Sequence, residues 1–340
     1  MASLFKKLFL ILFFLLIVVS LAVFVNPKLS DRVGADSPLQ IKKEPQTTKL
    51  VFVGDLMLDR GVKSSVINNL NGSYLSLFDY TKETLSGADI LFGNLEGPIS
   101  DKGNNVGSKY SFRMSPEVFP ALKETGFDVL SFANNHVGDW NVSAFTDTLL
   151  RASSTEIIIA GAGGSKAEAS EVDIIEKNGT KFGFLAFSDV GPVWIKAEES
   201  SPGILLLADP SLSQIVSEAK TEVDVLIVSI HWGDEYKEYN GRQQEYAHKI
   251  IDSGADVIIG HHPHVIQGTE KYKDSLIFYS LGNFIFDQKF SEKTMEAGVV
   301  EIVYEGKTPI KTTFYTWKLN SFFQPEKIIQ EVAIKYKSLI

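Results

Sequence analysis

Residues 258–264, Ile258-Ile259-Gly260-His261-His262-Pro263-His264, join an apolar run to a cluster of histidines. This stretch holds three of the six histidines of this 340-residue chain, and they come directly after the apolar run 255–259 and Gly260. Because the residue before a proline avoids helical geometry, we expect the cluster in a turn beyond the end of a buried strand. Imidazole is the commonest metal-ligating side chain, so this pattern favours a metal site over a His-rich surface turn.

The same order, an apolar run followed by polar residues that bind metals, occurs four more times in the chain. In open α/β sheets, ligands bind beyond the carboxyl ends of the strands, so we expect all five clusters at one rim. Each residue alone could instead be a turn residue or a hydrogen-bonded core histidine. Six donors suit two ions that share a carboxylate better than one tetrahedral ion. The candidate metal ligands are Asp55, Glu96, Asn135, His231, His262 and His264. We expect His261 to have a packing or supporting role.

The amino-acid composition limits which kinds of metal site and which partners are expected. The chain has no cysteine, so disulfides and thiolate metal sites are excluded, and manganese, zinc or iron held by His, Asp, Glu and Asn is expected. The net charge is −9, and residues 1–48 carry six Lys and Arg against three Asp and Glu, which leaves −12 for the remainder. An acidic domain is a poor match to a nucleic-acid backbone, so no nucleic-acid partner is expected.

The N-terminal residues have the apolar composition of a membrane-spanning segment. Residues 8–25 contain Ser20 as their single polar residue, and as a helix they would extend about 27 Å, close to the thickness of the bilayer core. No clean cleavage site follows, which favours an uncleaved anchor over a secretory signal. We therefore expect a signal-anchor over 1–25, a flexible linker over 26–48 and one domain over 49–340. The protein would be a single-pass cell-membrane protein with its domain on the extracytoplasmic side.

Beyond the linker, short β-rich runs alternate with amphipathic stretches. This alternation predicts an α/β domain with helices flanking sheet. A more strand-rich C-terminal third suggests a second sheet with antiparallel pairs. The expected helices are 77–85, 116–124, 142–152, 210–221 and 243–253.

Six motifs carry a resemblance to a known family. They are Gly54-Asp55-Leu56-Met57-Leu58, Asn94-Leu95-Glu96-Gly97-Pro98, Ala133-Asn134-Asn135-His136, His231-Trp232-Gly233-Asp234-Glu235-Tyr236, Gly260-His261-His262-Pro263-His264-Val265-Ile266-Gln267 and Ser280-Leu281-Gly282-Asn283-Phe284. Their types and order resemble the CapA/PgsA family of bacterial capsule (poly-γ-glutamate) synthesis proteins. That family is similar to the calcineurin-like metallophosphoesterases, which implies a four-layer α/β/β/α sandwich after the N-terminal transmembrane helix.

The resemblance also implies roles for single residues. Asp55 matches the first metal-binding aspartate of the phosphoesterases, Glu96 stands at their bridging carboxylate, and His136 matches the histidine that protonates a leaving group. Asn135, His231, His262 and His264 match further metal ligands. Met57 stands where the phosphoesterases have a histidine, so one metal position is short of a ligand and phosphatase activity is not assumed.

Five further polar residues are candidates near the rim. Glu235, next to the His231 motif, is a candidate acid or base beside His136. The candidate substrate-binding residues are Arg60, Asn94, Arg113 and Asn283. The two arginines would grip carboxylate or phosphate groups, or else form surface ion pairs. Asn283 would orient a histidine or contact substrate.

The function expected from these features is capsule or surface-polymer biogenesis by a membrane-anchored protein. One or two divalent ions would act on, or hold, an anionic poly-γ-glutamate-like polymer or peptide. Other capsule-synthesis membrane proteins are expected partners. Three alternatives stay open: a metal-dependent phosphoesterase or amidase with another substrate, a non-catalytic polymer-binding or export subunit, and a metal-dependent peptide epimerase.

Overall fold

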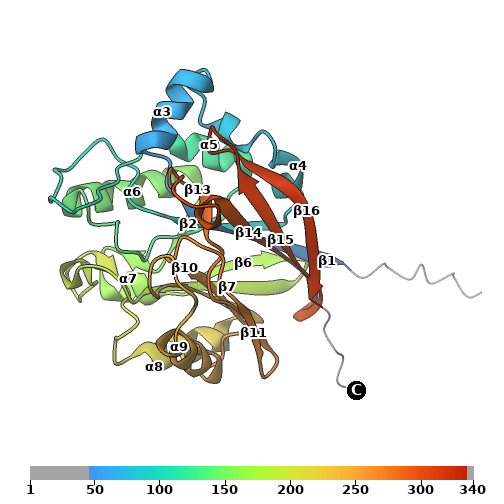
Figure 1. The fold of residues 1–340 in the computed structure, drawn as a ribbon. Helices are drawn as coiled ribbons and strands as arrows, with labels where there is room; N and C mark the ends of the chain where they lie inside the picture. Colours follow the sequence, from blue (N-terminus) through green and yellow to red (C-terminus); the bar gives the residue numbers. More distant parts are fainter. Residues whose placement is uncertain (1–45, 335–340) are drawn as a thin grey trace, which may run out of the picture. The chain divides into compact units, whose positions relative to one another are not determined.

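Two β-sheets form the centre of the protein, with helices on their outer sides (Figure 1). The computed structural model describes residues 46–334, and for 328–334 it describes the backbone alone. The anchor expected over 1–25 and most of the linker lie outside these residues. Within 46–334, none of the helices is long and apolar enough to cross a membrane.

The larger sheet has the strand order β16-β15-β14-β1-β2-β3-β4, and β13 also pairs with β1. Its parallel part consists of β1 (Thr47–Leu56), β2 (Ile90–Leu95), β3 (Val129–Ser131) and β4 (Ile158–Ala160). Its antiparallel part consists of β14 (Glu296–Glu305), β15 (Thr308–Leu319) and β16 (Pro325–Ile334). The short strand β13 (Asn283–Ile285) runs parallel to the end of β1. The antiparallel part explains the strand-rich C-terminal third of the sequence.

The smaller sheet has the order β11-β12-β10-β9-β7-β6. Four parallel strands form its middle: β7 (Thr180–Ser188), β9 (Val225–His231), β10 (Val257–His261) and β12 (Ser275–Phe278). Antiparallel strands β6 (Asp173–Lys177) and β11 (Thr269–Tyr272) close its two edges. A separate two-stranded pair joins β5 (Ala162–Gly163) to β8 (Gly203–Ile204).

Helices cover the outer face of each sheet. On the side of the larger sheet lie α3 (Arg60–Asn69), α4 (Lys82–Ser86), α5 (Val118–Thr125) and α6 (Asn141–Thr155). On the side of the smaller sheet lie α8 (Leu212–Glu222) and α9 (Gly241–Asp252), with α7 (Lys166–Ser170) next to β5 and β8. The mixed α/β prediction is confirmed.

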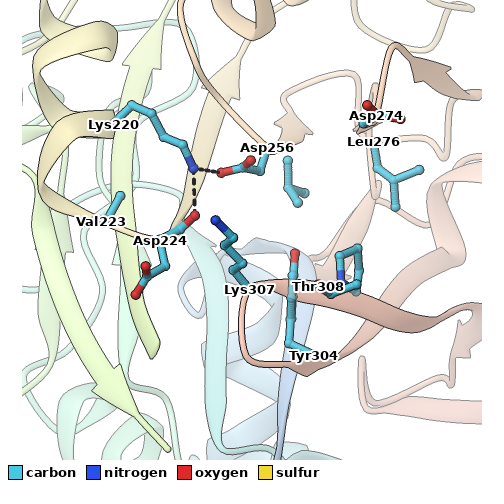
Figure 2. A pocket seen from close by; sticks show the side chains of 11 residues that line it. Lys220, Val223, Asp224, Asp256, Asp274, Leu276, Tyr304, Lys307 and Thr308 are labelled. Atoms are coloured by element: carbon cyan, nitrogen blue, oxygen red, sulfur yellow. Dashed lines mark hydrogen bonds and ion pairs between the residues drawn. The ribbon is translucent and has the colours of Figure 1, made fainter. Parts of the chain in front are cut away.

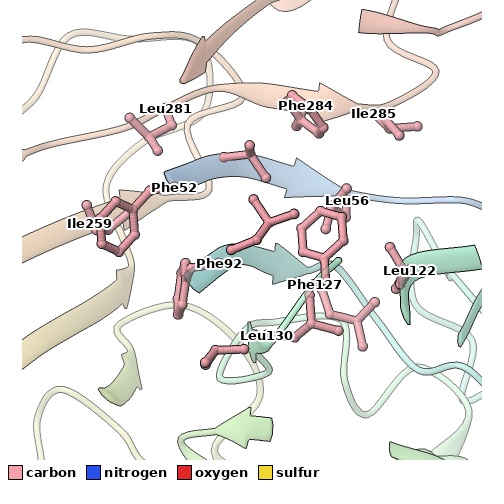
Figure 3. Close-up of a cluster of buried hydrophobic side chains, with 14 of the residues drawn as sticks. Phe52, Leu56, Phe92, Leu122, Phe127, Leu130, Ile259, Leu281, Phe284 and Ile285 are labelled. Carbon is pink, nitrogen blue, oxygen red and sulfur yellow. The ribbon is translucent and has the colours of Figure 1, made fainter. Parts of the chain in front are cut away.

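The sequence of strand β9 is almost continuously apolar because both of its faces are covered. Val225 and Ile227 belong to the core between the two sheets, whereas Leu226, Val228 and Ile230 pack in the second cluster, which includes side chains of α8 and α9. A strand with both faces covered has no polar alternation. Figure 3 shows the inter-sheet core, where Phe52 and Phe92 of the larger sheet lie near Ile259 of the smaller one.

One predicted helix needs correction, and one observed helix was not predicted. The single helix expected over 77–85 is instead a 3-10 turn (Leu75–Phe78) followed by α4, because the Thr81 hydroxyl donates to the Phe78 carbonyl and ends the first turn. Helix α3 was not expected, since its sequence, RGVKSSVINN, has few apolar residues. It nevertheless forms with Val62 and Val66 buried against the core.

A buried carboxylate on α6 gives the first testable prediction. Asp147 pairs with Lys102 and Arg151 and accepts a hydrogen bond from Ser100. Burial alone would raise the pKa of Asp147, but these three partners lower it to about 2, from 3.8. Because the pKa of Asp147 is lower in the folded protein than in the unfolded chain, its carboxylate stabilises the fold at pH values above about 4. This stabilisation is lost as the pH falls from about 4 toward 2.

The Asp147→Asn substitution is therefore expected to cost about 1–2 kcal/mol at pH 7, and the cost should shrink below pH 4. Urea unfolding at several pH values measures it. Asp101→Asn is the control, because Asp101 pairs with the same Arg151 but is 65% exposed, and we expect a change below about 0.5 kcal/mol. A pH-independent difference for Asp147→Asn would contradict the assignment.

Candidate metal centre

The candidate ligands come from strand ends that meet at one rim. Asp55 lies at the end of β1, Glu96 follows β2, and His231 is the last residue of β9. One donor atom from each of these three residues lies within 4.8 Å of the others, and all three side chains are buried. The carboxyl ends of parallel strands in both sheets therefore meet at one centre, the arrangement expected for α/β ligand sites.

Backbone packing sets the position of Asp55. Its N–H donates to the Gly282 carbonyl at 2.9 Å, so β1 runs against the segment that leads into β13. A Cβ on Gly54 would lie 1.9 Å from that same carbonyl oxygen, so only glycine fits before Asp55.

The two carboxylates are joined through one amide. The Asn94 side-chain NH₂ donates to Asp55 Oδ1 at 2.9 Å and to Glu96 Oε2 at 2.5 Å. Asn94 itself is completely buried, with Asn134 Nδ2 3.4 Å from its carbonyl oxygen. Asn94, expected to bind substrate, is therefore placed between the two carboxylates.

The remaining ligand candidates lie around this pair. Asn135 Oδ1 lies 2.7 Å from His231 Nε2, and that nitrogen lies 3.6 Å from Glu96 Oε1. The rings of His231 and His262 are 4.7 Å apart between centroids. His264 Nδ1 lies 3.3 Å from Asp55 Oδ2. The structure thus brings all six predicted ligands into one cluster.

The pKa values of the two buried carboxyl groups are shifted in opposite directions. Burial raises the pKa of Glu96 well above its usual range, and the charge of Asp55 raises it further. Burial alone would raise the pKa of Asp55, but His261 and His264 hold it well below its usual value. Two buried acids with no Lys or Arg paired to either among the described residues form a site that suits a cation.

Two of the clustered histidines, His231 and His262, are held neutral. Burial and neighbouring His262 lower the pKa of His231 well below its usual value, and burial and His264 lower that of His262 to about 3. Neutral imidazole is the form that binds metals.

The fit of these residues to a metal can be judged from the buried polar atoms that have no hydrogen-bond partner. Among the described residues, Asp55 Oδ2, Glu96 Oε1, His231 Nδ1 and His262 Nδ1 are buried without such a partner. Leaving buried polar atoms unpaired costs about 1–3 kcal/mol each. The donor set of carboxylate oxygens and imidazole nitrogens therefore fits a divalent ion, and it suits zinc, iron or manganese.

The turn that carries two of the histidines is strained. His262 has φ +97° and His264 has φ +58°, in the left-handed region that non-glycine residues avoid. The backbone is held there by hydrogen bonds from Trp232 N–H to the His261 carbonyl and from Tyr236 N–H to the Pro263 carbonyl. Strain of about 1–3 kcal/mol at such residues persists where function requires it.

Comparing two substitutions at His262 measures this strain. Neither glycine nor alanine can bind a metal, but only glycine relieves the backbone. We expect metal-free His262→Gly to be more stable than His262→Ala by about 1 kcal/mol, because the strain relief exceeds the entropic cost of glycine. Urea unfolding gives the difference, and a less stable glycine variant would show that the turn is unstrained.

His136 lies beside the cluster and is held by a residue that the sequence reasoning missed. Its Nδ1 lies 2.7 Å from Asp139 Oδ2, while its Nε2 faces Glu96 Oε1 at 4.0 Å. The Phe112 ring lies 4.0 Å away between centroids. A carboxylate on one imidazole nitrogen fixes the ring and its tautomer, which leaves the other nitrogen for proton transfer. The spacing His136-x-x-Asp139 was the available signal.

A cleft of about 200 Å³ opens beside His136 and His264. Its other walls include Glu235, which is exposed, and the partly exposed aromatic rings of Tyr110, Tyr236 and Phe290. Glu235, the candidate acid or base, thus lines the cleft but is exposed to solvent rather than buried beside the metal ligands.

Both candidate arginines are already engaged. Arg60 forms a two-bond ion pair with Asp287 on the cleft wall, at 3.2 and 3.0 Å. Arg113 donates to the Lys102 carbonyl, and its guanidinium stacks over Trp140 at 3.5 Å from the ring centroid. Arg60 is thus the one of the two that lines the cleft, and its ion pair corresponds to the alternative left open for it.

Asn283 supports a histidine. Its Oδ1 lies 3.0 Å from His264 Nδ1, and its NH₂ donates to Gln288 and to the Thr294 carbonyl. The side chain is completely buried, so of the two roles expected for it, the geometry favours orienting the histidine.

A second cavity, of about 590 Å³, lies at the opposite end of the strands. It is lined by Val257, the first residue of β10, and by Asp224, which precedes β9. Figure 2 shows Lys220 bonded to the Asp256 carboxylate and to the Asp224 carbonyl, both at 2.7 Å. These bonds tie α8 to the starts of two strands, a structural role, and no metal-ligand cluster lies among its lining residues.

The fold and the rim together define the class: a mixed α/β protein with a buried carboxylate and histidine centre at its strand ends. The sequence profile described as bacterial capsule synthesis protein PGA_cap matches residues 49–288, and the chain belongs to this family. The resemblance predicted from the six motifs is confirmed.

Two curated relatives agree with this assignment. The PGA biosynthesis protein CapA of Bacillus subtilis (strain 168) is 36% identical over 255 residues, which are 74% of this chain and 66% of the relative. The Capsule biosynthesis protein CapA of Bacillus anthracis is 33% identical over 279 residues, 79% of this chain and 67% of the relative. The chain thus spans about two thirds of the length of these relatives.

A solved structure supports the fold alone. A hypothetical protein of Thermus thermophilus superimposes with a TM-score of 0.50 at 14% identity, covering 80% of this chain and 99% of that one.

Proposed function

We propose that this protein is a metal-dependent enzyme of capsule biogenesis, which cleaves an amide or phosphoester bond in an anionic γ-glutamyl polymer or its precursor. The observation that carries the proposal is the cluster of six ligand-type side chains, four of which have a buried donor atom without a hydrogen bond, next to a cleft lined by His136. When bound, divalent ions there would activate water and offset negative charge that develops on the substrate.

Individual residues of the chain would bind the metal and transfer the proton. Asp55, Glu96 and His231 would hold the ion or ions, with Asn135, His262 and His264 completing the set. His136, fixed by Asp139, would move a proton at Nε2.

The aromatic cleft walls would position a chain segment beside the centre. Tyr110, Tyr236 and Phe290 offer flat apolar surfaces, while the ion pair with Asp287 leaves the charge of Arg60 largely compensated. Recognition of the polymer would therefore use its backbone and methylene groups as well as its carboxylates.

We also propose that residues 1–25 anchor the protein in the cell membrane, with the domain outside the cytoplasm and near other capsule-synthesis proteins. The support is the apolar run 8–25 and the family assignment. Protease accessibility of the domain in intact spheroplasts tests this orientation, and protection of the domain would contradict it.

The function is tested with the purified domain loaded with Mn²⁺, Zn²⁺ or Fe²⁺. Poly-γ-glutamate and simple phosphoesters are incubated with it, and chain length and released phosphate are measured. We expect metal-dependent cleavage that a chelator stops. Metal binding without cleavage of either substrate would favour the polymer-binding subunit, and exchange of deuterium into a peptide would favour the epimerase.

A further inference from the structure

The position of His261 in the structure differs from the packing or supporting role that we expected from the sequence. It is the last residue of β10 and pairs in register with His231 on β9, so both side chains stand at the same rim. It is completely buried, and its Nδ1 lies 3.3 Å from Asp55 Oδ1. Within the described part of the chain, neither of its ring nitrogens has a hydrogen-bond partner.

Packing alone does not account for this residue. The ring lies over Phe92, with centroids 6.2 Å apart, a position that an apolar ring would fill equally well. A buried imidazole with two unpaired nitrogens instead costs about 1–3 kcal/mol for each unsatisfied group. A ligand that pairs with one of these nitrogens would remove part of that cost.

The distance between His261 and Asp55 favours shared coordination over a direct hydrogen bond. Two ligand atoms bound to one tetrahedral ion at 2.0–2.1 Å lie about 3.3–3.4 Å apart. The separation of 3.3 Å between His261 Nδ1 and Asp55 Oδ1 matches that value, and it is longer than the about 2.7–2.9 Å of a hydrogen bond between a charged imidazole and a carboxylate. Asp55 Oδ2 faces His264 Nδ1 at the same distance on its other side.

The neighbouring candidate for this position offers no free donor. Met57, two residues after Asp55, is completely buried in the core, and its sulfur accepts a hydrogen bond from the Asp59 N–H at 3.4 Å. The segment that follows β1 therefore offers no second donor beside Asp55, while His261 presents one from the facing sheet.

We propose that His261 is a metal ligand, binding through Nδ1 the ion that Asp55 also holds. The inference rests on the proposed metal centre. Together with His264 it gives the Asp55 side of the centre its own imidazole donors, separate from His231 beside Glu96 and from His262, whose ring lies next to that of His231. The centre then holds two ions rather than one.

The test counts bound metal rather than activity. Wild type, His261→Phe and His248→Phe are loaded with Co²⁺, dialysed and measured by elemental analysis and by visible absorption of the cobalt. His261→Phe keeps the ring and removes the donor. His248 pairs with Glu270 and stacks on Tyr272 on the surface of α9, so its variant controls for the loss of one histidine.

We expect two ions per chain in wild type and in His248→Phe, and one in His261→Phe, with a changed cobalt spectrum. Equal metal content and spectra in His261→Phe and wild type would overturn the inference and leave the metal centre standing. No bound metal in wild type would overturn the proposed function itself. If His261→Phe does not fold, as judged by circular dichroism, His261→Gln replaces it, with at least a tenfold weaker second ion expected and an unchanged affinity overturning the inference.

Discussion

Glu96→Gln is expected to abolish the rise in stability that divalent metal gives the wild-type protein. An ion present at 100 times its dissociation constant stabilises the folded state by about 2.7 kcal/mol, and this gain should disappear when the central carboxylate is lost. Thermal unfolding with and without Mn²⁺ or Zn²⁺ measures it.

The same substitution should stabilise the metal-free protein, by about 1–3 kcal/mol. Glu96 and Asp55 are both completely buried and are joined through Asn94, and no Lys or Arg pairs with either within the described residues. A neutral amide removes their repulsion and the cost of burying a second charge. The opposite signs with and without metal identify a binding site, because an ordinary core residue would lose stability in both conditions.

Glu301→Gln is the matched control. Glu301 is largely buried on β14 and pairs with Lys49, away from the rim. We expect its variant to keep the full metal-dependent rise. A wild-type protein whose stability does not respond to metal, or a Glu96→Gln variant that responds like wild type, would contradict the assignment of Glu96.

His136→Gln is expected to lower turnover by about 10²–10⁴-fold without changing metal content. General acid–base catalysis contributes an effect of this size, and Nε2 of His136 faces the centre and the cleft. The substrate is whichever polymer or phosphoester the metal-loaded protein cleaves, and elemental analysis of the same samples gives the metal content.

Asp139→Asn separates positioning from proton transfer. It keeps His136 but weakens the contact that fixes its ring, so we expect a smaller loss of about 10–100-fold, again with full metal content. Unchanged turnover in His136→Gln would assign His136 a structural role and would favour the non-catalytic polymer-binding subunit.

Much of the centre could be predicted from the sequence because the signal was local. Asp55, Glu96, His231 and the His262-x-His264 pair each follow an apolar run that becomes a buried strand, and parallel strands deliver their ends to one edge. The family motifs then fixed the order of these residues.

The other assignments depended on contacts between distant segments. Arg60 meets Asp287, 227 positions further along the chain, and this pairing decides that its guanidinium is already engaged. The placement of His261 depends on which face of β10 looks toward β1, and Ile259 and His261 share the face toward the inter-sheet core. Neither fact can be obtained from local spacing.

The metal content of the purified protein tests the central claim most directly. The domain is expressed, treated with chelator, reloaded with Mn²⁺, Zn²⁺ or Fe²⁺, dialysed and analysed by elemental mass spectrometry. The account predicts stoichiometric divalent metal in wild type and at least one ion fewer in Glu96→Gln. A wild-type protein that retains no divalent metal under these conditions would contradict it.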